Sequence, residues 1–145
     1  MSNINPKIWG QPGWIFLHSI TFSYSQNPTP NDKIIMKDFF TNLQFILPCL
    51  SCKNNYARHI QIYPLNDEVL SNRKNLVDWL ITIRNISNKE IGKPEITLKD
   101  VIEQLESHQM SSSSHKKNSK SKFIIALLVA IIIILIIYYN YSKSN

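Results

Sequence analysis

Two cysteines separated by two residues are the side chains of this chain best suited to chemistry. Cys49 and Cys52 follow Pro48, and the apolar spacing after them predicts a helix that begins at this point. Backbone amides at a helix N-terminus, together with the positive end of the helix dipole, stabilise a thiolate and lower the pKa of a cysteine. A pair with this spacing can also close a disulfide that other thiols exchange with. The motif therefore indicates a redox-active pair.

Three other interpretations of the cysteine pair stay open at this point. A structural zinc site needs four ligands, and besides the cysteines only His59 and His18 are candidates inside the helical region. A thioredoxin-like fold would place the motif in a βαβ pattern, whereas the spacing on both sides is helical. The third interpretation is two inert buried cysteines, although such pairs seldom stand at a helix start behind a proline.

Two further groups of residues indicate a binding site for a large ligand that has both polar and planar parts. Trp14 and His18 are four residues apart and share one face of a helix, where core packing is the competing explanation. A later helix carries a short polar stripe that continues beyond its end, formed by Arg84, Asn85, Asn88 and Lys93. A solvated helix face explains this stripe equally well on its own. A ligand site also explains why the stripe is short and rich in amides.

The elements that must position these residues are helical throughout the first 110 residues. Apolar residues at spacings of three and four predict helices around residues 12–24, 35–46, 49–63 and 76–83. Thr97 and Asp100 have the spacing of a capping box and predict a short fifth helix. No segment alternates as a strand would. We therefore expect an all-α fold, a four-helix bundle plus a short fifth helix, followed by a C-terminal transmembrane helix.

The expected membrane helix is residues 123–139, an apolar run without a charged residue. Residues 111–122 are rich in serine and lysine and predict a flexible linker, and residues 140–145 form a short tail. Four lysines precede the apolar run and one follows it, so the first 110 residues are expected on the cytosolic side. These features predict a single-pass membrane protein with a C-terminal anchor in a virion or host membrane.

The composition excludes several classes of function. The chain of 145 residues has three glycines, Gly10, Gly13 and Gly92, and their spacing fits neither a G-x-G-x-x-G dinucleotide-binding turn nor a P-loop. Its two cysteines cannot build a disulfide-rich scaffold. The formal charge of +6 belongs mainly to the last 35 residues, because residues 1–110 hold 11 basic and 10 acidic side chains. A nucleic-acid partner is therefore not expected.

Four motifs together resemble the FAD-linked sulfhydryl oxidases of the Erv/ALR type, especially the short forms of large DNA viruses. The resemblance covers Trp9 to Pro94. Its motifs are W-G-x-x-G-W-x-x-L-H from Trp9 to His18, C-x-x-C with Tyr56 and His59, Arg73-x5-Trp79, and Asn85-x-x-Asn88 running into Ile91-Gly92-Lys93-Pro94. Their order and spacing agree with the family, which is more specific than any one motif.

The resemblance implies a helical bundle that binds FAD and oxidises thiols. It implies that Cys52 lies against the flavin and that Cys49 is the outward cysteine that exchanges disulfides with a substrate. It also implies a set of residues that bind or enclose FAD: Trp9, Gly10, Trp14, His18, Tyr56, His59, Arg84, Asn85, Asn88 and Lys93. Reduced FAD would pass its electrons to O2 and form H2O2, so that two protein thiols become one disulfide.

Two departures from the family pattern change what is expected. Arg84 stands where many relatives have a histidine, so one expected imidazole contact to FAD is either missing or replaced by a guanidinium. The second shuttle pair and the structural disulfide of cellular relatives are both missing, because the chain has two cysteines. Cys49 and Cys52 would therefore receive electrons directly from a separate dithiol protein, expected to be thioredoxin-like. The resemblance also implies a homodimer.

Two rival functions come from other classes. The first is a tail-anchored helical adaptor that binds a partner helix and has inert cysteines, and the second is a small zinc-binding membrane module. Bound flavin and oxygen consumption in the presence of a dithiol would distinguish the oxidase from both.

Overall fold

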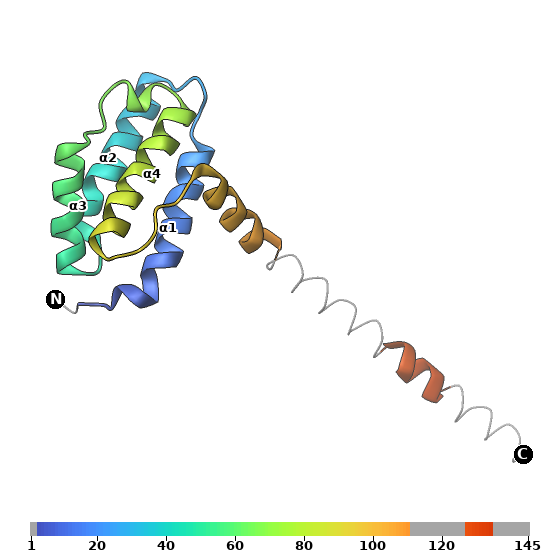
Figure 1. Cartoon of the computed structure of the whole chain (residues 1–145). Coiled ribbons are helices and arrows are strands. Elements are labelled where there is room, and N and C mark those ends of the chain that lie inside the picture. Colours follow the sequence, from blue (N-terminus) through green and yellow to red (C-terminus); the bar gives the residue numbers. More distant parts are fainter. Residues whose placement is uncertain (1–2, 111–126, 135–145) are drawn as a thin grey trace, which may run out of the picture. The chain divides into compact units, whose positions relative to one another are not determined.

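The computed structural model describes residues 3–110 and 127–134, while residues 1–2, 111–126 and 135–145 lie outside the described part. Contacts divide the chain into two compact units, Met1–Leu105 and Glu106–Asn145. The first unit contains the helices α1 to α4, which Figure 1 shows packed as a bundle. Every residue of the predicted site belongs to this unit.

The bundle helices are α1 (Pro6–Ser23), α2 (Pro30–Ile46), α3 (Leu50–Ile62) and α4 (Arg73–Glu90), with the 3-10 helix η1 (Val69–Ser71) before α4. A further helix covers residues 98–110. The side chain before each bundle helix accepts a hydrogen bond from a backbone N–H of the first turn; these caps are Asn5, Thr29, Cys49 and Asn72. Local side-chain chemistry therefore sets where each helix begins.

The core lies where α1 packs on α4 and α2 packs on α3. Leu76, Leu80 and Ile83 are fully buried along one face of α4, at the spacing of three and four residues that one helix face requires. Across the bundle, the ring of Phe40 meets the ring of Trp79 edge to face, with centroids 5.2 Å apart. The apolar face of α4 is therefore the centre of the bundle.

Buried polar side chains join the helices through backbone carbonyls. The hydroxyl of Tyr56 on α3 donates to the carbonyl oxygen of Phe40 on α2, at 2.8 Å. The indole Nε1 of Trp79 donates to the carbonyl oxygen of Tyr63, at 2.9 Å. Arg73, the other residue of the Arg73-x5-Trp79 motif, donates through Nε to the carbonyl oxygen of Tyr24, at 2.6 Å. Tyr56 thus joins α3 to α2, while Trp79 and Arg73 hold the loops that follow α3 and α1 against the rest of the bundle.

The connection from α4 to the helix at residues 98–110 is fixed by side-chain amides of α4. Asn85 donates to the carbonyl oxygen of Ile96 at 2.9 Å and accepts from its backbone N–H at 2.8 Å. The next helix begins with the predicted capping box, in which Thr97 N donates to Asp100 Oδ2 at 2.7 Å and Asp100 N donates to Thr97 Oγ1 at 3.3 Å. Val101 follows and is buried.

The helical bundle agrees with the sequence prediction, with a difference at its first helix. The sequence places Pro12 in a first helical turn, whereas α1 begins six residues earlier, where Asn5 caps the helix and Pro6 occupies its first position. Pro12 therefore lies inside α1, where it cannot donate to the carbonyl oxygen of Ile8. The 3-10 helix η1 carries no pattern in the sequence that would predict it.

The predicted transmembrane helix is wrong. Within the two described ranges, none of the helices has the length and apolar character that a membrane crossing requires. Of the predicted span 123–139, the structure describes residues 127–134, which are helical. Residues 123–126 and 135–139, like the predicted linker 111–122 and tail 140–145, lie outside the described residues.

The predicted localisation is corrected for the same reason. A single-pass protein with its catalytic domain on the cytosolic side of a virion or host membrane required the C-terminal anchor, and no described helix supplies one.

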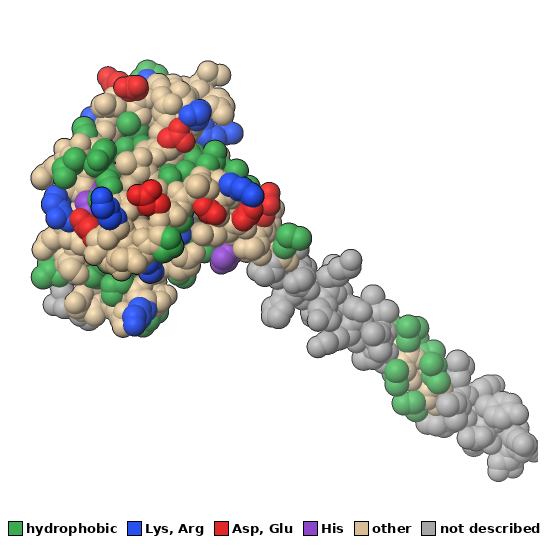
Figure 2. Space-filling model, in the orientation of Figure 1, with side chains coloured by type: hydrophobic (Ala, Val, Ile, Leu, Met, Phe, Trp, Pro, Cys, Tyr) green, Lys and Arg blue, Asp and Glu red, His purple; other side chains and the backbone are tan. Residues whose placement is uncertain are grey.

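The surface of the bundle mixes both charge signs with apolar side chains. Figure 2 shows basic and acidic side chains interspersed on the face in view. Large apolar side chains are also exposed, and α2 presents four of them: Ile34, Ile35, Phe45 and Ile46. The exposed side of α2 is therefore apolar enough to favour a protein contact.

We predict that Tyr56→Phe lowers the free energy of unfolding by about 1–2 kcal/mol, because a buried hydrogen bond between α2 and α3 is lost. Urea unfolding of the full chain measures the change. Tyr63→Phe is the matched control, because this tyrosine is exposed and should shift stability by no more than about 0.5 kcal/mol. Equal effects of the two substitutions would contradict a structural role for the Tyr56 hydroxyl.

Candidate functional site

The two cysteines form a disulfide at the start of α3. Cys49 and Cys52 are bonded, with Cα atoms 5.1 Å apart. Cys49 is the N-cap residue, and its Sγ accepts a hydrogen bond from the backbone N–H of Cys52 at 3.1 Å. Ser51 Oγ also lies 3.1 Å from the same sulfur. A thiolate at Cys49 would therefore be stabilised by the backbone amide and the positive end of the α3 dipole.

The exposure of the two cysteines differs from the expectation that Cys49 faces outward. Cys49 is 2% exposed, whereas Cys52 is half-buried. The segment before α1 bonds to the backbone on both sides of Cys49, since Ile4 N donates to the carbonyl oxygen of Pro48 at 3.0 Å and Leu50 N donates to Asn3 Oδ1 at 3.3 Å. This segment, residues 3–5, therefore lies against Cys49.

A second group of predicted residues comes together between α1 and α4. The ring centroids of Trp14 and His18 are 6.2 Å apart, and the guanidinium carbon of Arg84 lies 5.8 Å from the Trp14 ring centroid. His18 and Arg84 are buried, at 1% and 4% exposure, and Trp14 is half-buried. The structure thus places an indole, an imidazole and a guanidinium side by side.

This group has buried polar atoms without partners. Both ring nitrogens of His18, and Nε and Nη1 of Arg84, make no hydrogen bond. Burial, with a smaller contribution from the Arg84 charge, lowers the pKa of His18 to about 4, so the imidazole is neutral at pH 7. Burial also lowers the pKa of Arg84. Unpaired buried atoms are rare in folded proteins, and here they gather in one place, which is typical of a site that a ligand completes.

His59 and Tyr56 differ from this group because they are satisfied inside the protein. His59 is equally buried, but its Nε2 lies 3.0 Å from Glu90 Oε1 and its Nδ1 lies 3.4 Å from Ser87 Oγ. Glu90 also pairs with Arg58. Burial raises the pKa of Tyr56, whose hydroxyl already binds a carbonyl of α2. Both side chains join helices, and their predicted contact with a cofactor stays a prediction.

The polar stripe of α4 mostly faces the loop that follows the helix. Asn85 binds the backbone of Ile96, and Asn88 Nδ2 donates to the carbonyl oxygen of Pro94 at 3.0 Å. Lys93 is exposed, and its backbone N–H donates to the carbonyl oxygen of Asn88 at 2.8 Å. The stripe therefore shapes the loop, and of its members only Arg84 joins Trp14 and His18.

Trp9 and Gly10 lie on α1 at the end of the bundle that carries the disulfide. The indole Nε1 of Trp9 donates to the carbonyl oxygen of Ile4 at 3.3 Å, within the segment that bonds around Cys49. A Cβ atom added at Gly10 would meet nothing within 4 Å. Trp14 and His18 follow Trp9 by five and nine residues, about 8 and 14 Å along the helix. The disulfide and the aromatic group could therefore both be reached by one elongated ligand.

Two residues near the site were not predicted from the sequence. Gln104 Oε1 accepts a hydrogen bond from Arg84 Nη2 at 3.1 Å, but Gln104 lies beyond the last matched motif. Asn3 bonds next to Cys49 from the start of the chain. Glutamine or asparagine alone on a polar helix face or terminus gives no signal, and only the contact made through the fold reveals either residue.

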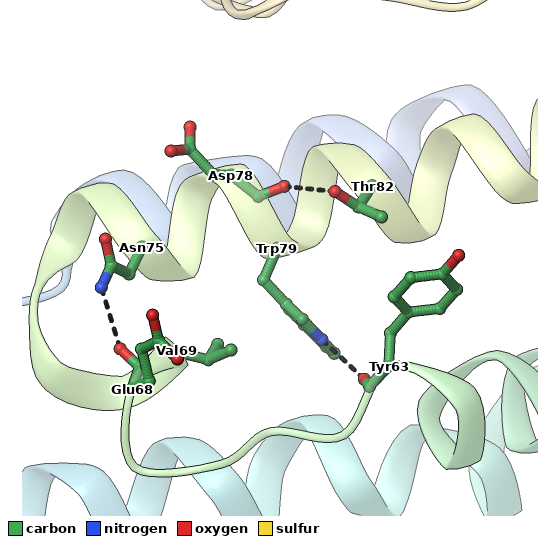
Figure 3. A pocket seen from close by; sticks show the side chains of 7 residues that line it. All are labelled: Tyr63, Glu68, Val69, Asn75, Asp78, Trp79 and Thr82. Atoms are coloured by element: carbon green, nitrogen blue, oxygen red, sulfur yellow. Dashed lines mark hydrogen bonds between the residues drawn. The ribbon is translucent and has the colours of Figure 1, made fainter.

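A cavity of about 260 Å³ lies elsewhere on the bundle, between the start of α4 and the segment after α3. Figure 3 shows Trp79 reaching across it to the carbonyl of Tyr63, and Asn75 donating to the carbonyl of Glu68. None of the predicted site residues lines this cavity. Asn75 Nδ2, Trp79 Nε1 and Thr82 Oγ1 in its lining each already donate to a backbone carbonyl oxygen.

The described part of the chain contains no group of three His, Cys, Asp or Glu side chains that could hold a metal ion. The zinc interpretation therefore has no support there.

Known proteins are similar to this chain over most of its helical region. The model of the Erv1 / Alr family matches residues 11–111. A probable FAD-linked sulfhydryl oxidase of Acanthamoeba polyphaga mimivirus is 45% identical over 103 residues, which are 71% of this chain and 72% of that protein. The mitochondrial FAD-linked sulfhydryl oxidase of Schizosaccharomyces pombe is 31% identical over 85 residues, 59% of this chain and 46% of that protein.

Solved structures show the same fold. The crystal structure of the FAD-binding domain of Erv1 from Saccharomyces cerevisiae matches with a TM-score of 0.63 and 26% identity, covering 72% of this chain and 97% of that chain. The crystal structure of the yeast Erv1 core gives the same TM-score and identity and is covered to 86%. Because the family model matches well over half of the residues and the bundle agrees with these structures, the chain belongs to the Erv1 / Alr family.

Proposed function

We propose that this chain is an FAD-linked thiol oxidase that makes disulfides in protein substrates through Cys49 and Cys52. The observation that carries the proposal is the exchangeable disulfide at the capping position of α3. The relatives from mimivirus and Schizosaccharomyces pombe, named as FAD-linked sulfhydryl oxidases, support the same activity. The catalytic domain we propose is residues 1–110.

The residues between α1 and α4 fit an FAD molecule. A planar ring system can pack against Trp14, and the unpaired nitrogens of His18 and Arg84 can bind its polar atoms. Trp9 and Gly10 lie toward the disulfide and leave space around the Gly10 backbone. We propose these five residues as the main contacts. Asn85, Asn88 and Lys93 would contribute through the loop that they shape.

The chemistry that FAD supplies when bound is the acceptance of two electrons from a pair of thiolates and their delivery to O2, which becomes H2O2. The residues of the chain perform the thiol exchange. A substrate thiolate attacks Cys49 Sγ, and Cys52 leaves as a thiolate while a mixed disulfide forms. The second substrate thiolate then attacks the substrate sulfur of the mixed disulfide. The disulfide of the substrate forms, and Cys49 leaves as a thiolate. The amide of Cys52, which already donates to Cys49 Sγ, stabilises the departing charge.

The electron donor is proposed to be a dithiol protein of thioredoxin-like character. The chain has two cysteines, so it has no second pair that could pass electrons to Cys49 from within. A homodimer is also proposed, because α2 exposes large apolar side chains that a second copy could cover.

We predict that Cys52→Ser in the full chain abolishes oxygen consumption with a dithiol substrate and leaves bound flavin in place. The reason is that Cys49 alone has no disulfide for a substrate thiolate to attack, so no electron pair can pass from the substrate to the flavin. An oxygen electrode and the visible spectrum of the purified protein measure the two properties. A colourless wild-type protein would overturn the proposed function.

Cys49→Ser is the companion variant and should also abolish turnover of a protein dithiol. The two variants differ in which sulfur stays: Cys52 should perturb the flavin spectrum as a thiolate when it remains alone, whereas Cys49 should not. A perturbed spectrum in Cys52→Ser instead would reverse the assignment of the two cysteines.

Removing a hydrogen bond between residues 3–5 and the backbone beside Cys49 should speed reduction of the disulfide. Asn3→Ala removes the acceptor for Leu50 N, and one net hydrogen bond of about 1 kcal/mol predicts an increase of about fivefold. Stopped-flow reduction by limiting dithiothreitol measures the rate. Lys7→Ala changes an exposed side chain just beyond this segment and should leave the rate unchanged. An unchanged rate in Asn3→Ala would show that the segment does not limit access to Cys49.

A further inference from the structure

Arg84 is a buried cation whose charge no carboxylate neutralises. Its side chain is 4% exposed, and Nη2 donates to Gln104 Oε1 at 3.1 Å. Nε and Nη1 have no partner, and no Asp or Glu within residues 3–110 forms an ion pair with this guanidinium. An unpaired charge out of water costs several kcal/mol, so the arrangement calls for an anion.

Asp100 is the carboxylate that acts on Arg84, and it does so without bonding to it. Its field raises the pKa of Arg84 against the larger effect of burial. Its Oδ2 accepts from the backbone N–H and from the hydroxyl of Thr97, both at 2.7 Å. Since Asp100 is committed to the cap of the helix at residues 98–110, it leaves the N–H groups of Arg84 available.

The guanidinium is held in position by uncharged groups. Its carbon lies over the Trp14 ring, and Gln104 Oε1 accepts from both Arg84 Nη2 and Gln11 Nε2, at 3.1 and 3.3 Å. Gln104 therefore connects α1, α4 and the helix at residues 98–110 at one point. A side chain fixed in this way, with its remaining N–H groups unpaired, is preorganised for an acceptor that carries negative charge.

We infer that Arg84 binds the diphosphate of FAD and that Gln104 is the positioning residue that aims it. The inference rests on the proposed function, because it takes FAD as the ligand. In oxidised FAD the diphosphate carries the anionic oxygens, while the isoalloxazine and adenine rings offer neutral acceptors. His18 is neutral beside Arg84 and cannot balance its charge.

The location along α1 agrees with this assignment. Trp9 marks the disulfide end of the helix, and Trp14, which stacks with Arg84, lies about 8 Å further along. If the flavin ring lies at Cys52, a group beside Arg84 is displaced from it along the bundle. The part of FAD that meets Arg84 is therefore expected to be the linking phosphates and not the reacting ring.

Affinities for FAD and riboflavin, which lacks the diphosphate, test the inference in the full-length protein stripped of flavin. Arg84→Gln should weaken FAD binding by about 10- to 100-fold and change riboflavin binding by less than about twofold. Flavin fluorescence quenching measures both constants. The reduction potential of bound FAD should stay the same. Lys89→Gln removes an equal charge from the exposed side of α4 and is the matched control, expected to change neither affinity.

Gln104→Glu provides a second variant that keeps the shape of the site. The new carboxylate would pair with Arg84 at the distance of the present hydrogen bond, so it should raise the melting temperature of the flavin-free protein and weaken FAD binding about tenfold. Riboflavin binding should not change. A merely structural role of Gln104 would alter the affinities for both flavins by the same factor.

The outcomes separate the inference from the function on which it rests. A wild-type protein that binds neither flavin overturns the proposed function. A wild-type protein that binds FAD, with variants at Arg84 and Gln104 that lose FAD and riboflavin equally or shift the flavin potential, overturns the diphosphate assignment alone. If Arg84→Gln fails to fold, the ratio of FAD affinity to riboflavin affinity is measured in Arg84→Lys and Gln104→Glu instead. A loss confined to FAD supports the diphosphate assignment, and an equal loss of both flavins overturns it.

Discussion

Burial of a polar side chain costs free energy unless the side chain finds a partner, and this cost divides the polar groups of the bundle into two kinds. His59 meets Glu90 and Ser87, so it stabilises the packing of α3 on α4. His18 is equally buried but unpaired, as are two nitrogens of Arg84. The satisfied groups define the scaffold, and the unsatisfied groups define where a ligand is needed to complete it.

A glycine-poor helical bundle must hold a nucleotide cofactor by other means than a phosphate loop. The chain has three glycines, and Gly92 alone has a positive φ, in the loop after α4. In the proposed FAD site, side chains on helix faces would take the place of loop amides: an aromatic plane from α1, a guanidinium from α4 and an amide from the helix that follows. Such a site depends on helix packing for its geometry, and the buried face of α4 provides that packing.

Much of the fold could be predicted because its signals are local. The capping box at Thr97, the helix start behind Pro48 and the apolar faces all follow from neighbouring residues. Contacts between distant segments could not be predicted. The burial of Cys49 depends on residues 3–5, and the position of Arg84 depends on Gln104, twenty residues away. The membrane helix was predicted from hydropathy alone, and no helix within residues 3–110 and 127–134 has the length and apolar character that a membrane crossing requires.

The position of Cys49 serves both the redox chemistry of its sulfur and the start of α3. As the N-cap of α3 its sulfur accepts the amide of Cys52, which lowers the cost of the thiolate and makes it a good leaving group. The same amide must be capped for α3 to begin there, so the redox group and the helix start are one structure. Reduction of the disulfide then leaves a thiolate that still caps the helix. The start of α3 can therefore keep its geometry through a catalytic cycle, while residues 3–5 bond to the backbone on both sides of Cys49.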